Sequence, residues 1–156
     1  GFPSRMAKPE QSPMDLLLQA NRLGQKNAEG FYIFEKDQRG RLQKQYNDAV
    51  EAVLAPCRHT HTELMDEDIV ARMMIPMVTE MARCLEEGII DSPAEADLSL
   101  LYGLGFPNFR GGVMRWVDTV GINNIIAMTE KWQHLGELYE PTEGMRALAH
   151  SSDGYY

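Results

Sequence analysis

The chain has 156 residues, of which 44% are apolar and 24% charged, as in an ordinary globular protein. Its 15 basic and 23 acidic side chains give a net charge of −8, which argues against nucleic acid or an anionic membrane as the main partner. No stretch approaches the roughly 20 apolar residues of a membrane helix, and the first residues lack a signal-peptide pattern. We therefore expect no membrane insertion, and the 2 cysteines, too few for a disulfide framework, predict a reduced, cytoplasmic setting. The length excludes a Rossmann unit of about 150 residues together with a separate substrate domain.

The N-terminal part predicts one helix and one hairpin. Ser12 is a good helix cap, and the pattern after it predicts a helix over residues 12–23. The aromatic and β-branched run at 31–34 predicts a strand, the turn signal at 37–40 reverses the chain, and 41–43 returns as a second strand. An isolated hairpin is marginally stable, so we expect it to pack on helices.

The rest of the sequence predicts helices. Apolar residues spaced by three and four, such as Val70, Met73 and Met77, define an amphipathic helix, and Ser92 followed by proline starts another. The predicted helices cover residues 47–54, 66–87, 92–102, 112–119, 123–135 and 142–150. The expected fold is all-α with one small β-hairpin. We expect two helical subdomains, at 1–55 and 66–156, joined by a linker at 56–65.

Two short segments repeat the same residue types. Residues 29–32 and 153–156 both read acidic, glycine, aromatic, tyrosine, and each follows an apolar helix. This weak internal match is consistent with two related repeats, of which the first lacks its front half.

Possible metal and catalytic groups are few. Cys57, His59 and His61 stand at alternate positions and could supply zinc ligands, but their segment reads as a linker, which is the favoured interpretation. Glu80 lies in the middle of a predicted helix, where a salt bridge to an arginine is favoured over acid–base catalysis. We therefore predict no catalytic residue and no metal site in this chain.

The stretch from Tyr102 to Pro107 is the most site-like part of the sequence. It joins a helix end, glycines at 103 and 105, and an aromatic ring with a hydroxyl, which suits an amphiphilic ligand. The alternative is a helix-to-helix turn packed on its neighbours, and the residues alone favour that alternative.

Several motifs resemble the C-terminal domains of 3-hydroxyacyl-CoA dehydrogenases. Leu23–Tyr32 looks like the end of the first such domain in that family. Similarity to the second domain is carried by residues 72–78 with Glu80, 83–88, 93–97, 102–107, 110–112 and 118–121. The ending, with 133–136, 138–139 and 155–156, resembles the α subunits of bacterial fatty acid oxidation complexes. Ala28 replaces a usual glycine of the family, so we expect that a left-handed backbone is not needed there.

The resemblance implies a function for a longer parent protein. The family oxidises 3-hydroxyacyl-CoA with NAD through a histidine and a glutamate of its Rossmann part, and neither has a counterpart here. The α subunits add an enoyl-CoA hydratase and assemble with a thiolase β subunit. Carried over by motif, Tyr102 is expected to be a substrate-binding residue. We expect a fragment that helps close the acyl-CoA cleft, contacts the Rossmann and hydratase parts, binds no cofactor and is inactive alone. The alternative is a stand-alone helical interaction module.

Overall fold

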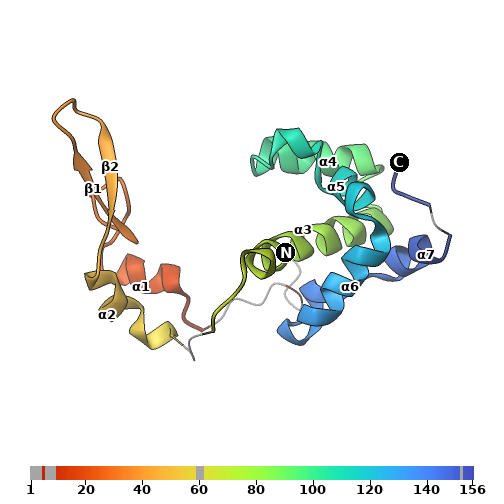
Figure 1. Ribbon diagram of the computed structural model, residues 1–156, viewed down its shortest axis with the longest axis horizontal. Helices are drawn as coiled ribbons and strands as arrows, with labels where there is room; N and C mark the ends of the chain where they lie inside the picture. The colour runs from red at the N-terminus through yellow and green to blue at the C-terminus, as the bar shows by residue number, and fades with distance from the viewer. Residues whose placement is uncertain (1–4, 6–9, 59–61, 152) are drawn as a thin grey trace. The chain divides into compact units, whose positions relative to one another are not determined.

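The computed structural model describes residues 5, 10–58, 62–151 and 153–156. The chain separates into two compact units, one spanning Ala7–Glu63 and the other comprising Arg5 and the chain from Leu64 to Tyr156. Figure 1 shows that the second unit is built from helices, whereas the first combines short helices with a hairpin. The predicted all-α fold with one small hairpin is confirmed over the described residues.

The Ala7–Glu63 unit contains α1 (Pro13–Gln19), β1 (Tyr32–Lys36), β2 (Leu42–Tyr46), α2 (Ala49–Leu54) and the 3-10 helix η1 (Ala55–Cys57). Helix α1 starts as its sequence predicts. The Ser12 hydroxyl accepts the Asp15 N–H at 3.2 Å, and the Asp15 carboxylate accepts the Ser12 N–H at 3.0 Å. This reciprocal pair satisfies two of the N–H groups that a helix start leaves open.

The predicted end of this helix at residue 23 is wrong, because α1 stops at Gln19. Asn21 takes a left-handed backbone with a φ of 54°. The Arg22 N–H then reaches back to the Leu17 carbonyl at 2.8 Å, and the Asn21 N–H reaches the Leu18 carbonyl at 3.0 Å. These two bonds form a Schellman end, in which asparagine replaces the usual glycine.

The expectation for Ala28 is also wrong, since its φ is 64°. The turn around it is closed by the Gly24 N–H donating to the Glu29 carbonyl at 2.8 Å. The Ala28 carbonyl accepts the Phe34 N–H at 2.9 Å, which ties the turn to β1. These bonds hold an alanine in a conformation that glycine adopts without strain.

The hairpin is antiparallel, with Tyr32 opposite Tyr46 and Lys36 opposite Leu42. Its turn is organised by Asp37, whose carboxylate accepts the N–H groups of Arg39 and Arg41, each at 2.9 Å. These bonds stabilise the charged carboxylate and so lower the pKa of Asp37, and the bond from the Arg41 backbone has the largest effect. Figure 1 shows the hairpin extending beyond α1 and α2, and β2 is exposed along its length.

The second unit is helical. Its elements are α3 (Asp66–Glu86), α4 (Pro93–Gly103), η2 (Asn108–Arg110), α5 (Val113–Val120), α6 (Ile122–Trp132), η3 (Gln133–Leu135), η4 (Glu137–Tyr139) and α7 (Glu143–Ser151). These bounds lie close to the predicted ranges, because capping residues and glycines mark most of the ends. Ser92 caps α4 by accepting the Glu95 N–H at 3.3 Å, while the Glu95 carboxylate bonds the Asp91 N–H and not that of Ser92.

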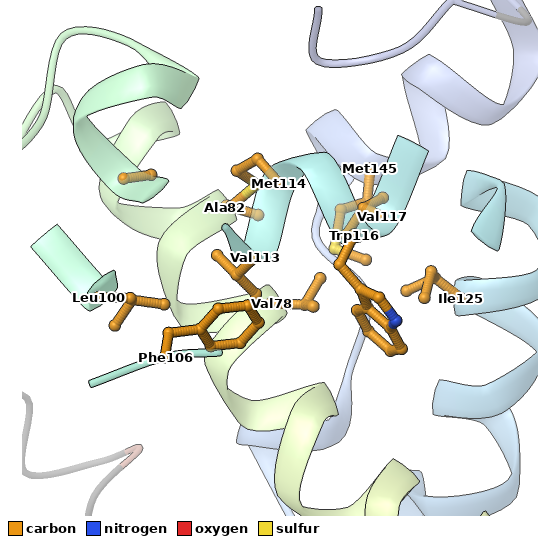
Figure 2. Close-up of a cluster of buried hydrophobic side chains, with 11 residues drawn as sticks. Val78, Ala82, Leu100, Phe106, Val113, Met114, Trp116, Val117, Ile125 and Met145 are labelled. Atoms are coloured by element: carbon orange, nitrogen blue, oxygen red, sulfur yellow. The ribbon is translucent and has the colours of Figure 1, made fainter. Parts of the chain in front are cut away.

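Helices α3 to α7 enclose one main core. Figure 2 shows it centred on the inward faces of α3 and α5, with Phe106 from the loop after α4. The fully buried members include Val78, Val113, Met114, Val117, Ile125 and Met145. A smaller cluster of Ala71, Ile75 and Trp132 joins α3 to α6. This core supports α4 and the loop that follows it.

Candidate functional site

Tyr102 lies in the last turn of α4 and is 87% exposed. Of the stretch Tyr102–Pro107, Tyr102 is therefore not packed on its neighbours, whereas Phe106 is buried. An exposed tyrosine presents an apolar ring and a hydroxyl to whatever contacts this end of the helix. Its position is set by α4, whose Leu100 and Ala96 are buried in the core on another face.

The loop after Tyr102 is a shaped structure. The N–H groups of Leu104 and Phe106 both donate to the Leu100 carbonyl, at 3.0 and 3.1 Å. Gly105 between them has a φ of 70°, which lets the chain turn back so that the Phe106 ring enters the core. Phe106 is 5% exposed, so the loop is anchored by one aromatic residue.

Asp97 fixes the other end of the loop. Its carboxylate is almost fully buried and accepts the N–H of Met114 at 2.6 Å and that of Arg115 at 3.3 Å. Both donors belong to the first turn of α5, where a helix favours negative charge. A Cβ on Gly112 would lie 2.1 Å from the Asp97 Cγ, so only glycine fits beside this carboxylate.

The C-terminal segment reaches the same carboxylate. The Tyr156 hydroxyl donates to Asp97 at 2.8 Å, and the Arg115 guanidinium lies 3.6 Å from the centre of the Tyr156 ring. The Asp118 carboxylate accepts the N–H groups of Tyr155 and Tyr156 at 2.9 and 3.1 Å. Burial, and then the bond to Asp97, raises the pKa of Tyr156 to about 12. Sequence reasoning missed Asp97, because its partners stand 17 to 59 residues further along.

Two more apolar side chains of this region face solvent. Leu104 is 70% and Phe109 84% exposed, and the Arg110 guanidinium lies 5.3 Å from the Phe109 ring centre. Together with Tyr102 they give the α4–α5 loop an apolar, aromatic surface with one hydroxyl. Exposed apolar and aromatic side chains of this kind are typical of a contact surface.

Other predicted site residues are only partly described. Cys57 donates through Sγ to the Gln11 carbonyl at 3.3 Å, while His59 and His61 lie outside the described residues. Within residues 5, 10–58, 62–151 and 153–156, no group of three or more His, Cys, Asp or Glu side chains could hold a metal ion.

Glu80 has the structural role expected of it. Arg5 donates through Nε and Nη2 to its two carboxylate oxygens at 3.1 and 3.0 Å, a bidentate ion pair. Arg5 also bonds Glu87 at 3.1 Å. The predicted salt bridge to an arginine is thereby confirmed.

Comparisons with known proteins show which family this chain belongs to. The family model for the 3-hydroxyacyl-CoA dehydrogenase C-terminal domain matches residues 69–151, which include Asp97, Tyr102 and Gly112. The structure is also similar to that of the dehydrogenase part of multifunctional enzyme 1 from C. elegans, with a TM-score of 0.57 and 18% identity. That match covers 89% of this chain but 33% of the other, so the chain spans about a third of its length, and the likeness shows the fold. The chain belongs to the 3-hydroxyacyl-CoA dehydrogenase C-terminal domain family.

Proposed function

We propose that this chain is the C-terminal helical part of a longer enzyme that oxidises 3-hydroxyacyl-CoA with NAD. Its role there is to close the acyl-CoA cleft and to contact the Rossmann part of the same chain. The observation that carries this proposal is the family match over the α3–α7 unit together with the exposed Tyr102 and its shaped loop. The two helical subdomains at 1–55 and 66–156 remain a prediction within this proposal.

Tyr102 is the residue that we propose as an acyl-CoA contact. Its hydroxyl and ring are available to a ligand, and the loop after it is held by Phe106 and by the Asp97 junction. In the full-length enzyme, Tyr102→Ala is expected to raise KM or lower kcat for 3-hydroxyacyl-CoA, with little change in melting temperature because the side chain is exposed. Tyr102→Phe separates the hydroxyl from the ring. A loss of stability without a change in turnover would return Tyr102 to a structural role.

The described residues include no arrangement that resembles an NAD-binding site. Dinucleotide sites use a parallel strand, a glycine-rich loop and a helix N-terminus. The sheet in the described part of the chain is a two-stranded antiparallel hairpin followed by the six-residue α2, which does not fit that site. We therefore assign no residue of this chain to NAD or to the chemical step, and we propose that the chain alone is inactive.

The proposal also covers a second activity, a partner subunit and the compartment of the longer enzyme. The longer enzyme also carries an enoyl-CoA hydratase, assembles with a thiolase β subunit and works in the cytoplasm, as in the bacterial α subunits that the motifs resemble. None of the described helices has the length and apolar character to cross a membrane. Co-purification of a thiolase with the full-length protein would test the partner.

A helical interaction module is the second candidate function. Helix α3 favours it, because Met65 just before the helix and Ile69 and Met73 within it repeat every four residues and are 70%, 44% and 65% exposed. An exposed apolar row of this kind marks a contact surface. Sedimentation of the purified chain discriminates between the two: concentration-dependent self-association supports the module, and a clean monomer weighs against it.

A further inference from the structure

The hairpin has two chemically different faces. Because alternate residues of a strand share a face, the register places one set of side chains together on one side. We call this side the cationic face; it consists of Tyr32, Phe34, Lys36, Leu42, Lys44 and Tyr46. The opposite side carries Ile33, Glu35, Gln43 and Gln45. The cationic face therefore holds aromatic, apolar and lysine side chains and no carboxylate of either strand.

The side chains of the cationic face are accessible. Tyr32 is 39%, Leu42 46% and Tyr46 61% exposed. The Lys44 ammonium lies 4.5 Å from the centre of the Tyr32 ring, so a positive charge and an aromatic surface are adjacent. Among the described residues, the ion pairs involve neither Lys36 nor Lys44. The carboxylate of Glu35 is engaged on the other side, where it accepts Gln45 at 3.2 Å.

Charge narrows the kind of ligand that fits this face. Residues 31–46 contain four basic and two acidic side chains, a local charge of 4 − 2 = +2, within a chain of net charge −8. The Ala7–Glu63 unit that carries the hairpin has eight basic and eight acidic side chains, so the excess positive charge of the hairpin stands in a unit without net charge. A small anion within a Debye length of about 8 Å is governed by the local charge.

We propose that the cationic face binds the nucleotide end of a coenzyme A thioester. That end combines a purine base with several phosphates. Exposed tyrosine rings stack bases without regard to sequence, and lysine ammonium groups contact phosphates. The inference rests on the proposed function, because that function supplies the ligand. It gives the exposed hairpin a role.

Binding is tested on the purified chain with adenosine 3′,5′-bisphosphate as the probe. Amide chemical shifts should move along β1 and β2 with a Kd of about 1 mM, as expected for few contacts to a small ligand. Lys36→Gln with Lys44→Gln should weaken binding about fivefold. Lys131→Gln, which removes the same charge from α6, should leave it unchanged. Retained amide dispersion of the hairpin shows that each variant is folded.

Substitutions at the rings separate base stacking from simple charge. Tyr46→Leu should weaken binding about tenfold, while Tyr46→Phe should retain it, because the ring supplies the stacking. Equal binding of inorganic phosphate, or shifts confined to other parts of the chain, would overturn the proposal. So would tighter binding of vesicles containing phosphatidylserine or of a DNA duplex, since either assigns the face to a macromolecule.

Kinetics of the full-length enzyme distinguish this inference from the proposed function. The double lysine variant should raise KM about fivefold for a 3-hydroxyacyl-CoA ester and leave KM unchanged for the corresponding pantetheine ester, which lacks the nucleotide. Equal KM values for the variant and the wild type on the CoA ester would overturn the cationic-face proposal and leave the dehydrogenase function intact. Absence of turnover by the wild-type enzyme would instead overturn the proposed function.

Discussion

Ala28 is a strained residue whose replacement by glycine should stabilise the protein. Its φ of 64° costs an L-residue about 1–2 kcal/mol, and the bonds that close the turn use only backbone groups, which Ala28→Gly preserves. Glycine also makes the unfolded chain more flexible, which lowers the free energy of unfolding by about 0.4–1 kcal/mol. The difference predicts a net gain of roughly 0.5–1 kcal/mol in the free energy of unfolding of the Ala7–Glu63 unit.

Urea unfolding followed by amide signals of this unit measures the effect. The matched control is Ala52→Gly in the exposed face of α2, where the same chemical change should cost about 0.5–1 kcal/mol because the residue is helical. Opposite signs for the two substitutions would support the reasoning. A loss of stability in Ala28→Gly would refute it, since it would mean that the turn tolerates alanine without strain.

Three further predictions concern the junction between α4 and α5. Gly112→Ala should destabilise the Leu64–Tyr156 unit by about 3 kcal/mol in thermal unfolding, because its Cβ meets the Asp97 carboxyl and its φ of 126° disfavours alanine; a wild-type melting temperature would contradict this. Asp97→Asn should cost about 2 kcal/mol, since Met114 and Arg115 donate to different carboxylate oxygens and the amide keeps only one acceptor, which leaves one N–H facing an NH2 group; a neutral result would contradict this. Burial and the bond to Asp97 raise the pKa of Tyr156 to about 12, above the value of about 10 in the unfolded chain. The contribution of Tyr156 to the free energy of unfolding is therefore complete below pH 10 and falls between pH 10 and 12. Tyr156→Phe should flatten that alkaline loss of stability, and an unchanged pH profile would count against the bond.

Sequence reasoning succeeded where structure is determined by neighbouring residues. The starts of α1 and α4 follow from Ser12 and Ser92, because a capping hydroxyl bonds an N–H three residues away. The hairpin follows from an aromatic strand, the turn at Asp37 and a return strand, all within 16 residues. The pairing of Glu80 with an arginine follows from the cost of burying an isolated carboxylate.

The misses have physical causes of two kinds. Asn21 and Ala28 adopt left-handed backbones although neither is glycine, so the turn is imposed by hydrogen bonds that residue type does not reveal. Asp97 and Tyr156 form part of the candidate site through contacts 17 to 59 residues apart, which local patterns do not register. Tyr102 illustrates the remaining limit, because only the fold shows that it faces solvent.

We propose that this chain supplies the helical, cleft-closing part of a 3-hydroxyacyl-CoA dehydrogenase and not its chemistry. The most direct test compares NAD reduction with 3-hydroxyacyl-CoA by the full-length enzyme and by the purified chain, each at saturating NAD. We expect turnover by the full-length enzyme and none by the chain alone. Turnover of 3-hydroxyacyl-CoA by the chain alone would contradict the proposal.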